Sequence, residues 1–150
     1  MSFNYTSVLI AVDDSDSAGR ALDFGLDLAE ILRLPVRVIH ATQSRNARSG
    51  EVRTIDYEEV QKAAGSIPDY ELAATVLERA LQRAGERAVS VEPVLLSGDP
   101  AEALLRYAAE CDRPMLVVGR RGRGRLQGLL MGSVSDKTVR LAKCPLMVIN

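Results

Sequence analysis

The chain has 150 residues, of which 47% are hydrophobic and 26% are charged, and its formal net charge at pH 7 is -1. This length suits one domain, residues 1–150, with a core of its own, and the composition is that of a globular protein rather than a disordered one. A net charge so close to zero argues against bulk attraction to nucleic acid or to a membrane surface.

The sequence lacks the signals of export and of membrane insertion. Residues 1–6 have neither the basic start nor the long apolar run of a signal peptide. The apolar runs are far shorter than the roughly 20 residues that a membrane-spanning helix needs. The two cysteines, Cys111 and Cys144, make no C-x-x-C pair and no metal-binding spacing. We therefore expect a cytoplasmic protein with two buried, reduced thiols.

The first quarter of the chain predicts a strand, a helix and a second strand. Ser7 to Val12 is a continuous apolar run rich in β-branched residues, which is typical of a strand buried on both faces. The polar turn at 13–17 offers helix caps, and apolar or small residues then recur every three or four positions until Pro35. Val36 to Ala41 predicts the second strand.

The middle of the chain is less regular. Residues 42–68 are polar, and we expect a long surface excursion with a helical turn near Tyr57 to Ala64. The helical period then returns from Asp69 and continues to Ala88. A third strand is predicted at 91–96. Its proline, at position 93, favours a sheet edge because proline donates no hydrogen bond to a neighbouring strand.

The last third begins with a clear helix start. Asp99 can cap a helix whose first residue is Pro100. A fourth strand is predicted at Met115 to Val118. After a glycine-rich segment, Ser133 matches the first position of an S-x-x-D capping box and is predicted to cap the last helix. Leu146 to Ile149 is the fifth strand.

This alternation of strands and helices predicts a three-layer α/β fold. The sheet should be open, parallel and five-stranded, with helices on both faces, as in Rossmann-like and flavodoxin-like proteins. Crossover connections should be right-handed.

Ligands of open parallel sheets bind outside the carboxyl ends of the strands, where the strand order reverses. Three segments should meet at that edge: 13–15, 39–41 and 119–122. The loop after the fourth strand ends at Gly132-Ser133, where a helix start offers free N–H groups and a positive dipole end. Glycines let phosphate oxygens approach such a backbone. The sequence therefore predicts a site for a phosphate-bearing nucleotide.

Two common phosphate motifs are absent from the sequence. Gly119 and Gly124 have the glycine spacing of a P-loop, but Arg125-Leu126 follows instead of Lys and Ser or Thr. The first strand is not followed by G-x-G-x-x-G, so the usual dinucleotide fingerprint is missing. The spacing present is instead G-x2-G-x9-G-S, from Gly119 through Gly122 to Gly132 and the following serine.

That motif, placed after the fourth strand, resembles the one carried by the ATP-binding subclass of the universal stress protein family. The resemblance covers essentially the whole chain. It includes the V-D-x-S turn at 12–15, the G-D-P helix start at 98–100 and the closing C-P-L-M-V-I segment at 144–149. The family often has glycine after the first aspartate, whereas this chain has Asp14, which adds negative charge near the site.

The resemblance implies strand order 3-2-1-4-5, bound ATP with Mg²⁺, and a homodimer joined through the fifth strand. It implies a stress-linked regulatory module that works through an unidentified protein partner, rather than a fast enzyme. Asp13 and the backbone beside it would hold adenosine, segment 39–41 would line the adenine pocket, and the glycine loop and last helix start would take the ribose and phosphates. The implied binding residues are Ala11, Val12, Asp13, Ile39, His40, Ala41, Val118, Gly119, Arg121, Gly122, Gly132, Ser133, Val134 and Ser135.

Several alternatives remain open on sequence alone. The chain can be a family member that has lost nucleotide binding and acts only by protein contacts. A true or slow ATPase would need a metal clamp, for which Asp13, Asp14 and Asp99 could assist a magnesium ion, but no residue is an evident base. Autophosphorylation on a serine is also open. A phosphoacceptor receiver domain would need an aspartate after the third strand, where Leu96-Ser97 stands.

Two residue types also have plainer interpretations. A lone histidine at a strand end, such as His40, is more often structural than catalytic. The four arginines between 120 and 125 can be a solvated loop or a phosphate contact, and nucleic-acid binding is disfavoured because no aromatic residues stand among them.

Overall fold

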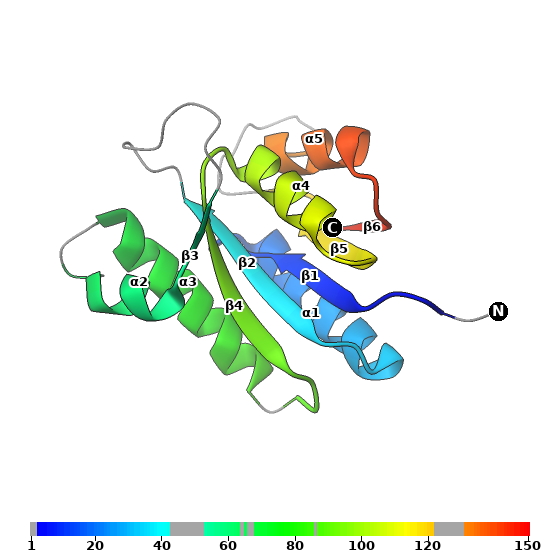
Figure 1. The fold of residues 1–150 in the computed structure, drawn as a ribbon, viewed down its shortest axis with the longest axis horizontal. Helices are drawn as coiled ribbons and strands as arrows, with labels where there is room; N and C mark the ends of the chain where they lie inside the picture. Colours follow the sequence, from blue (N-terminus) through cyan, green and yellow to red (C-terminus); the bar gives the residue numbers. More distant parts are fainter. Residues whose placement is uncertain (1–2, 43–52, 64, 66–67, 86, 122–130) are drawn as a thin grey trace.

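The computed structural model describes residues 3–42, 53–63, 65, 68–85, 87–121 and 131–150 (Figure 1). Strands and helices alternate along most of this chain. The elements are β1 (Ser7–Ala11), α1 (Asp16–Leu32), β2 (Val36–Thr42), β3 (Arg53–Ile55), α2 (Tyr57–Ala63), α3 (Pro68–Ala84), β4 (Val91–Ser97), α4 (Pro100–Glu110), β5 (Pro114–Gly119), α5 (Ser133–Leu141) and β6 (Leu146–Ile149).

The sheet has six strands in the order β3-β4-β2-β1-β5-β6. All neighbours are parallel except β3 and β4, which are antiparallel. If β3 is left out and the other five strands are numbered along the chain, their order in the sheet is 3-2-1-4-5, so the predicted topology is confirmed. The predicted count of five strands is wrong by one. The extra strand has only three residues, Arg-Thr-Ile, and its Ile55 is buried.

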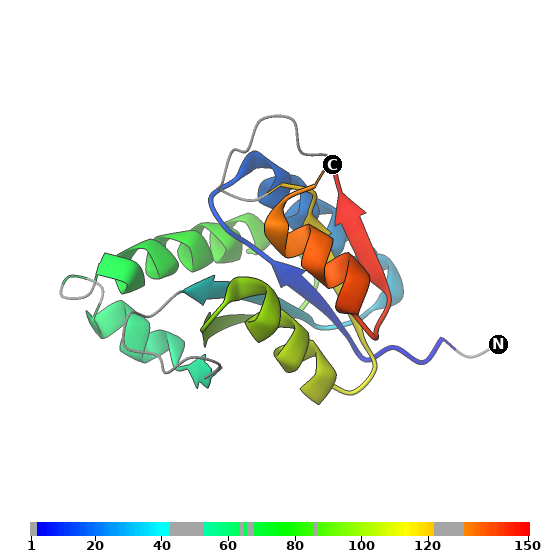
Figure 2. The ribbon, with the colours of Figure 1, turned by 90° about the horizontal axis from the view of Figure 1, so that it is seen from above.

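Two hydrophobic cores lie on the two faces of this sheet. Helices α1 and α3 cover one face, which we call the α1/α3 face, and α4 and α5 cover the other, the α4/α5 face (Figures 1 and 2). Side chains of one strand alternate between the faces, so Val38 packs with the first core and Ile39 with the second. The central strands are thus buried on both sides, as their continuous apolar runs predicted.

Pro93 lies in the part of β4 that pairs with β2 alone. It is opposite Val38, whereas β3 pairs only with residues 95–97 of β4. The presence of proline predicted a strand at the sheet edge, and this prediction is confirmed for the first half of β4, which includes Pro93.

Helix ends agree with the sequence in some places and differ in others. Asp99 caps α4 as predicted, its side chain accepting from the Glu102 N–H at 3.0 Å, with Pro100 at the first position. Helix α3 ends at Ala84, not Ala88, and Gly85 follows it. The last helix is capped by Gly132, so the prediction that Ser133 is the cap was wrong.

The reason for the shifted cap lies in the neighbouring strand. The Gly132 N–H donates to the Arg120 carbonyl at 2.7 Å, which holds Gly132 beside the end of β5 in an extended conformation. Ser133 is consequently the first residue of the helix. None of the helices in the part of the chain that the structure describes is both long and apolar enough to span a bilayer.

Candidate functional site

The turn after β1 places the Asp13 carboxylate at the carboxyl edge of the sheet. Asp13 Oδ1 accepts from the Ser15 N–H at 2.8 Å and from the Ser15 hydroxyl. Ser15 Oγ in turn accepts from the Ala18 N–H at 3.2 Å and caps α1. Aspartate favours such turns because its side chain can bond to backbone two residues on. The carboxylate is thus fixed in place by the start of α1.

The loops after β1 and β5 are tied together by a second serine, Ser17. Its buried hydroxyl accepts from the Arg121 N–H at 3.2 Å and donates to the Ile149 carbonyl at 3.3 Å. The Ser15 hydroxyl also lies 3.3 Å from the Arg121 carbonyl. The sequence analysis did not identify Ser17, because nothing distinguishes it from the other polar residues of its turn.

Gly119 is packed against the first turn of α1. A Cβ at this position would lie 2.5 Å from Ser17 Oγ and 2.9 Å from the Ala18 nitrogen. Real Cβ atoms do not approach backbone so closely. The contact explains why glycine ends β5 and lets the β5 loop lie directly against the loop after β1.

The start of α5 faces the same edge. Ser135 is buried, and its hydroxyl lies 2.7 Å from the Arg120 carbonyl and 3.1 Å from the Gly132 carbonyl. The Arg120 N–H donates to the Ile149 carbonyl at 2.7 Å. By helix geometry, the first-turn N–H groups of Ser133, Val134 and Ser135 have no acceptor within the helix. The exposed Ser133 hydroxyl stands beside them.

The three residues predicted at the end of β2 do not share one face. His40 lies on the α1/α3 face and is buried, with its Nδ1 2.9 Å from the Val12 carbonyl. Because a carbonyl only accepts, Nδ1 is the donor, which supports a structural role for this ring. Ile39 and Ala41 pack on the α4/α5 face. A ligand that reaches all three must therefore contact the backbone at the strand end.

The remaining predicted residues divide into buried and peripheral ones. Val118 is buried in the α4/α5 core, and Ala11 packs against the same core. The Val12 N–H already donates to the Ile39 carbonyl at 2.8 Å. Arg121 is exposed at the edge. Gly122 lies outside the described residues, as do the arginines at 123 and 125.

A metal site made by the protein alone is not present in the described ranges. No three His, Cys, Asp or Glu side chains gather there in a way that could hold an ion. Asp99, one of the three aspartates considered for magnesium, caps α4 and lies 3.6 Å from Lys137 Nζ. This leaves Asp13 and Asp14 as the acidic pair at the edge.

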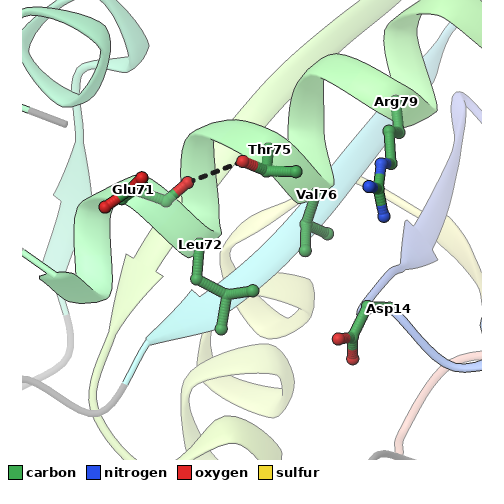
Figure 3. A pocket seen from close by; sticks show the side chains of 6 residues that line it. All are labelled: Asp14, Glu71, Leu72, Thr75, Val76 and Arg79. Atoms are coloured by element: carbon green, nitrogen blue, oxygen red, sulfur yellow. Dashed lines mark hydrogen bonds between the residues drawn. The ribbon is translucent and has the colours of Figure 1, made fainter. Parts of the chain in front are cut away.

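A cavity of about 410 Å³ adjoins this pair (Figure 3). Asp14 forms one wall, and α3 forms the other. The sequence analysis missed the contribution of α3, because periodicity identifies which residues of a helix are buried but not which loop its exposed residues face. The lining residues from α3 are Glu71, Leu72, Thr75, Val76 and Arg79.

Both cysteines are free thiols, as expected, but they are half-buried rather than buried. Cys111 accepts a hydrogen bond from Arg37 at 3.2 Å. Partial burial raises the pKa of the Cys144 thiol above its ordinary value. Both residues pack against the α4/α5 core.

Comparison with known proteins agrees with this architecture. A universal stress protein of Mycobacterium tuberculosis is 31% identical over 147 residues, which cover 97% of each chain. One from Bacillus subtilis is 28% identical over 149 residues, covering 97% of this chain and 99% of the relative. A universal stress protein solved in complex with cAMP superposes with a TM-score of 0.67 at 26% identity, with 97% of each chain covered.

The family model of the universal stress proteins matches residues 4–150, which is nearly the whole chain. With its parallel sheet, its glycine-ended β5 and its α5 start at one edge, the chain belongs to the universal stress protein family.

Proposed function

We propose that this protein is a nucleotide-binding regulatory module whose ligand is ATP. One observation carries the proposal: the Asp13 carboxylate, the end of β5 and the first turn of α5, whose N–H groups have no acceptor within the helix, are held at one edge by direct hydrogen bonds. A helix start of this kind favours phosphate, and a fixed carboxylate can accept from ribose hydroxyls or an adenine amine. The site thus offers partners for both ends of a nucleotide.

The relative solved with cAMP supports the class of ligand. It shares this fold over nearly its full length, and cAMP carries the adenosine and phosphate that the proposed site would contact. The G-x2-G-x9-G-S spacing favours ATP among the adenine nucleotides, since it is the spacing of the ATP-binding subclass.

Magnesium would be held jointly by the ligand and the protein. Mg²⁺ typically keeps several waters and binds through one or two carboxylates together with substrate phosphates. Asp14 would supply such a carboxylate, because Asp13 is assigned to the adenosine end of the ligand. The metal would neutralise phosphate charge.

Binding rather than rapid catalysis is the proposed activity. Phosphoryl transfer needs a positioned base or water-orienting group. At the described part of this edge, the only histidine of the chain has its Nδ1 committed to the Val12 carbonyl. We propose that nucleotide occupancy alters contacts with a regulatory protein partner, and that any hydrolysis is slow.

A member of the family that binds no nucleotide is the second candidate. Ser135 and Gly119 favour it in one respect, because each has a packing role that does not need a ligand. The exposed Ser133 and the first-turn N–H groups of α5, which have no acceptor within the helix, favour the first candidate.

Replacing Gly132 with valine separates the two candidates. The backbone at Gly132 is extended, with φ -72°, a conformation open to any L residue, and valine would add a branched side chain at the residue that caps α5. We expect the ATP affinity measured by calorimetry to fall at least tenfold, about 1.4 kcal/mol. Gly65→Val, at an open position between α2 and α3, is the matched control. Unchanged affinity in a folded Gly132→Val variant would contradict the assignment.

A further inference from the structure

Arginines at the side of α3 fix this helix against α1. Arg83 donates to both carboxylate oxygens of Asp23, at 2.6 and 2.5 Å. Just beyond the helix, Arg87 pairs with Asp27 and, at 3.2 Å, with Glu30. The Arg83–Asp23 pair is exposed and the Arg87–Glu30 pair is half-buried, and ion pairs near the surface contribute little stability each. Together they set the register of the two helices.

The next arginine toward the carboxyl edge of the sheet is Arg79. It lies four residues before Arg83, so the two share one face of α3. Arg79 and Asp14 line the same cavity, and Figure 3 shows the guanidinium group directed toward the Asp14 side of that cavity. The row of arginines formed by Arg87, Arg83 and Arg79 thus ends beside the loop that carries Asp13 and Asp14.

Charge at this loop matters for a phosphate-bearing ligand. Asp13 and Asp14 are consecutive at the end of β1, so a nucleotide there meets two carboxylates beside its own negative phosphates. The excess negative charge disfavours the most highly charged ligand most strongly. A fixed cation facing the same cavity offsets part of that field.

We propose that Arg79 is an electrostatic positioning residue of the nucleotide site, and that it determines how well the site accepts the more highly phosphorylated ligands. This inference rests on the proposed function. Arg79 acts through the field at Asp14 and needs no direct contact with the ligand. Its effect therefore grows in the order adenosine, AMP, ATP, and it diminishes as added salt screens the charges.

Calorimetry on Arg79→Gln tests the proposal. At low salt we expect the ATP affinity to fall about threefold to fivefold, the AMP affinity to fall less and the adenosine affinity to stay unchanged. Arg79→Lys keeps the charge and should retain most of the ATP affinity. Measured without added Mg²⁺, for which Asp14 is a proposed ligand, the double variant Asp14→Asn/Arg79→Gln should recover the ATP affinity, because it lacks the charge that Arg79 offsets.

Arg83→Gln is the matched control, because it removes the same charge from the same helix face one turn farther from the site. It should lower stability slightly and leave the three affinities unchanged. The proposal is overturned if Arg79→Gln leaves the ATP affinity unchanged or lowers the affinity for all three ligands equally. It is also overturned if Arg83→Gln lowers the ATP affinity as much as Arg79→Gln does. If the unmodified protein binds none of the three ligands, the proposed function fails as well, whereas ATP binding that is insensitive to Arg79 overturns this inference alone.

Discussion

At the scale of single residues, Gly119 shows how packing and function can require the same amino acid. Its motif position suggests that glycine makes room for ribose or phosphate. In the structure the missing side chain makes room for Ser17 and Ala18 at the start of α1. The two explanations are compatible, because the close approach also joins the two loops that form the proposed site.

Gly119→Ala should therefore destabilise the fold even without ligand. The added methyl group would be forced against α1 backbone, and overpacking of this kind costs about 1–3 kcal/mol. Urea denaturation measures the change in the free energy of unfolding. Gly65→Ala is the control, since a Cβ there has nothing within 4 Å and its effect should stay within about 0.5 kcal/mol. Equal stability of the two variants would show that the Gly119 contact is not tight.

Site residues were predictable where the chemistry is local and unpredictable where it depends on the fold. The Asp13 turn and the Asp99 cap follow from residue types a few positions apart. The role of Ser17 depends on β5 and β6, more than a hundred residues away. His40 and Ile39 were predicted to line one pocket, but strand alternation directs them to opposite faces.

At the scale of elements, each helix and strand of the described residues except β3 was predicted, and the helical turn near Tyr57 to Ala64 is confirmed as α2. Strands β1, β5 and β6 carry continuous apolar segments, and the predicted positions of all strands other than β3 match to within two residues. Strand β3 has three residues, too few to show a period, and it forms because β4 offers an edge with which to pair. The α5 cap is Gly132 rather than Ser133 because the Gly132 N–H donates to the Arg120 carbonyl, just beyond β5, and is fixed there.

Strand β6 carries the assembly prediction. It is the last strand of the sheet on its side, and all four of its residues are only half-buried. Leu146 and Val148 pack toward one core, Met147 and Ile149 toward the other. A second copy that pairs antiparallel with β6 would satisfy its open backbone groups and complete the burial.

We accordingly expect a homodimer in solution, with larger assemblies possible. Light scattering at micromolar concentration should give a mass near twice the 16.3 kDa of one chain. Val148→Lys should shift the mass toward a monomer, with circular dichroism to verify the fold. Ile31→Lys, at an exposed position of α1, should not. A monomeric unmodified protein would refute β6 pairing.

At the scale of the whole molecule, the strand order brings loops that lead to opposite faces of the sheet to one edge. The chain leaves β1 toward α1 on one face and leaves β5 toward α5 on the other, while β1 and β5 are neighbours. This reversal brings the two loops side by side at the carboxyl edge of the sheet, where ligands of such folds bind. The βα alternation predicted the parallel sheet from the sequence, whereas the strand order that makes the reversal was implied by the family resemblance.

The central claim is that this edge of the sheet holds an adenine nucleotide. Mass spectrometry of small molecules released by denaturing the purified protein tests it directly, and calorimetry with added ATP completes the test if the site was emptied during purification. We expect ATP or its hydrolysis product ADP at a stoichiometry near one per chain, or saturable ATP binding by the emptied protein. Protein that releases no nucleotide and takes up no ATP would contradict it.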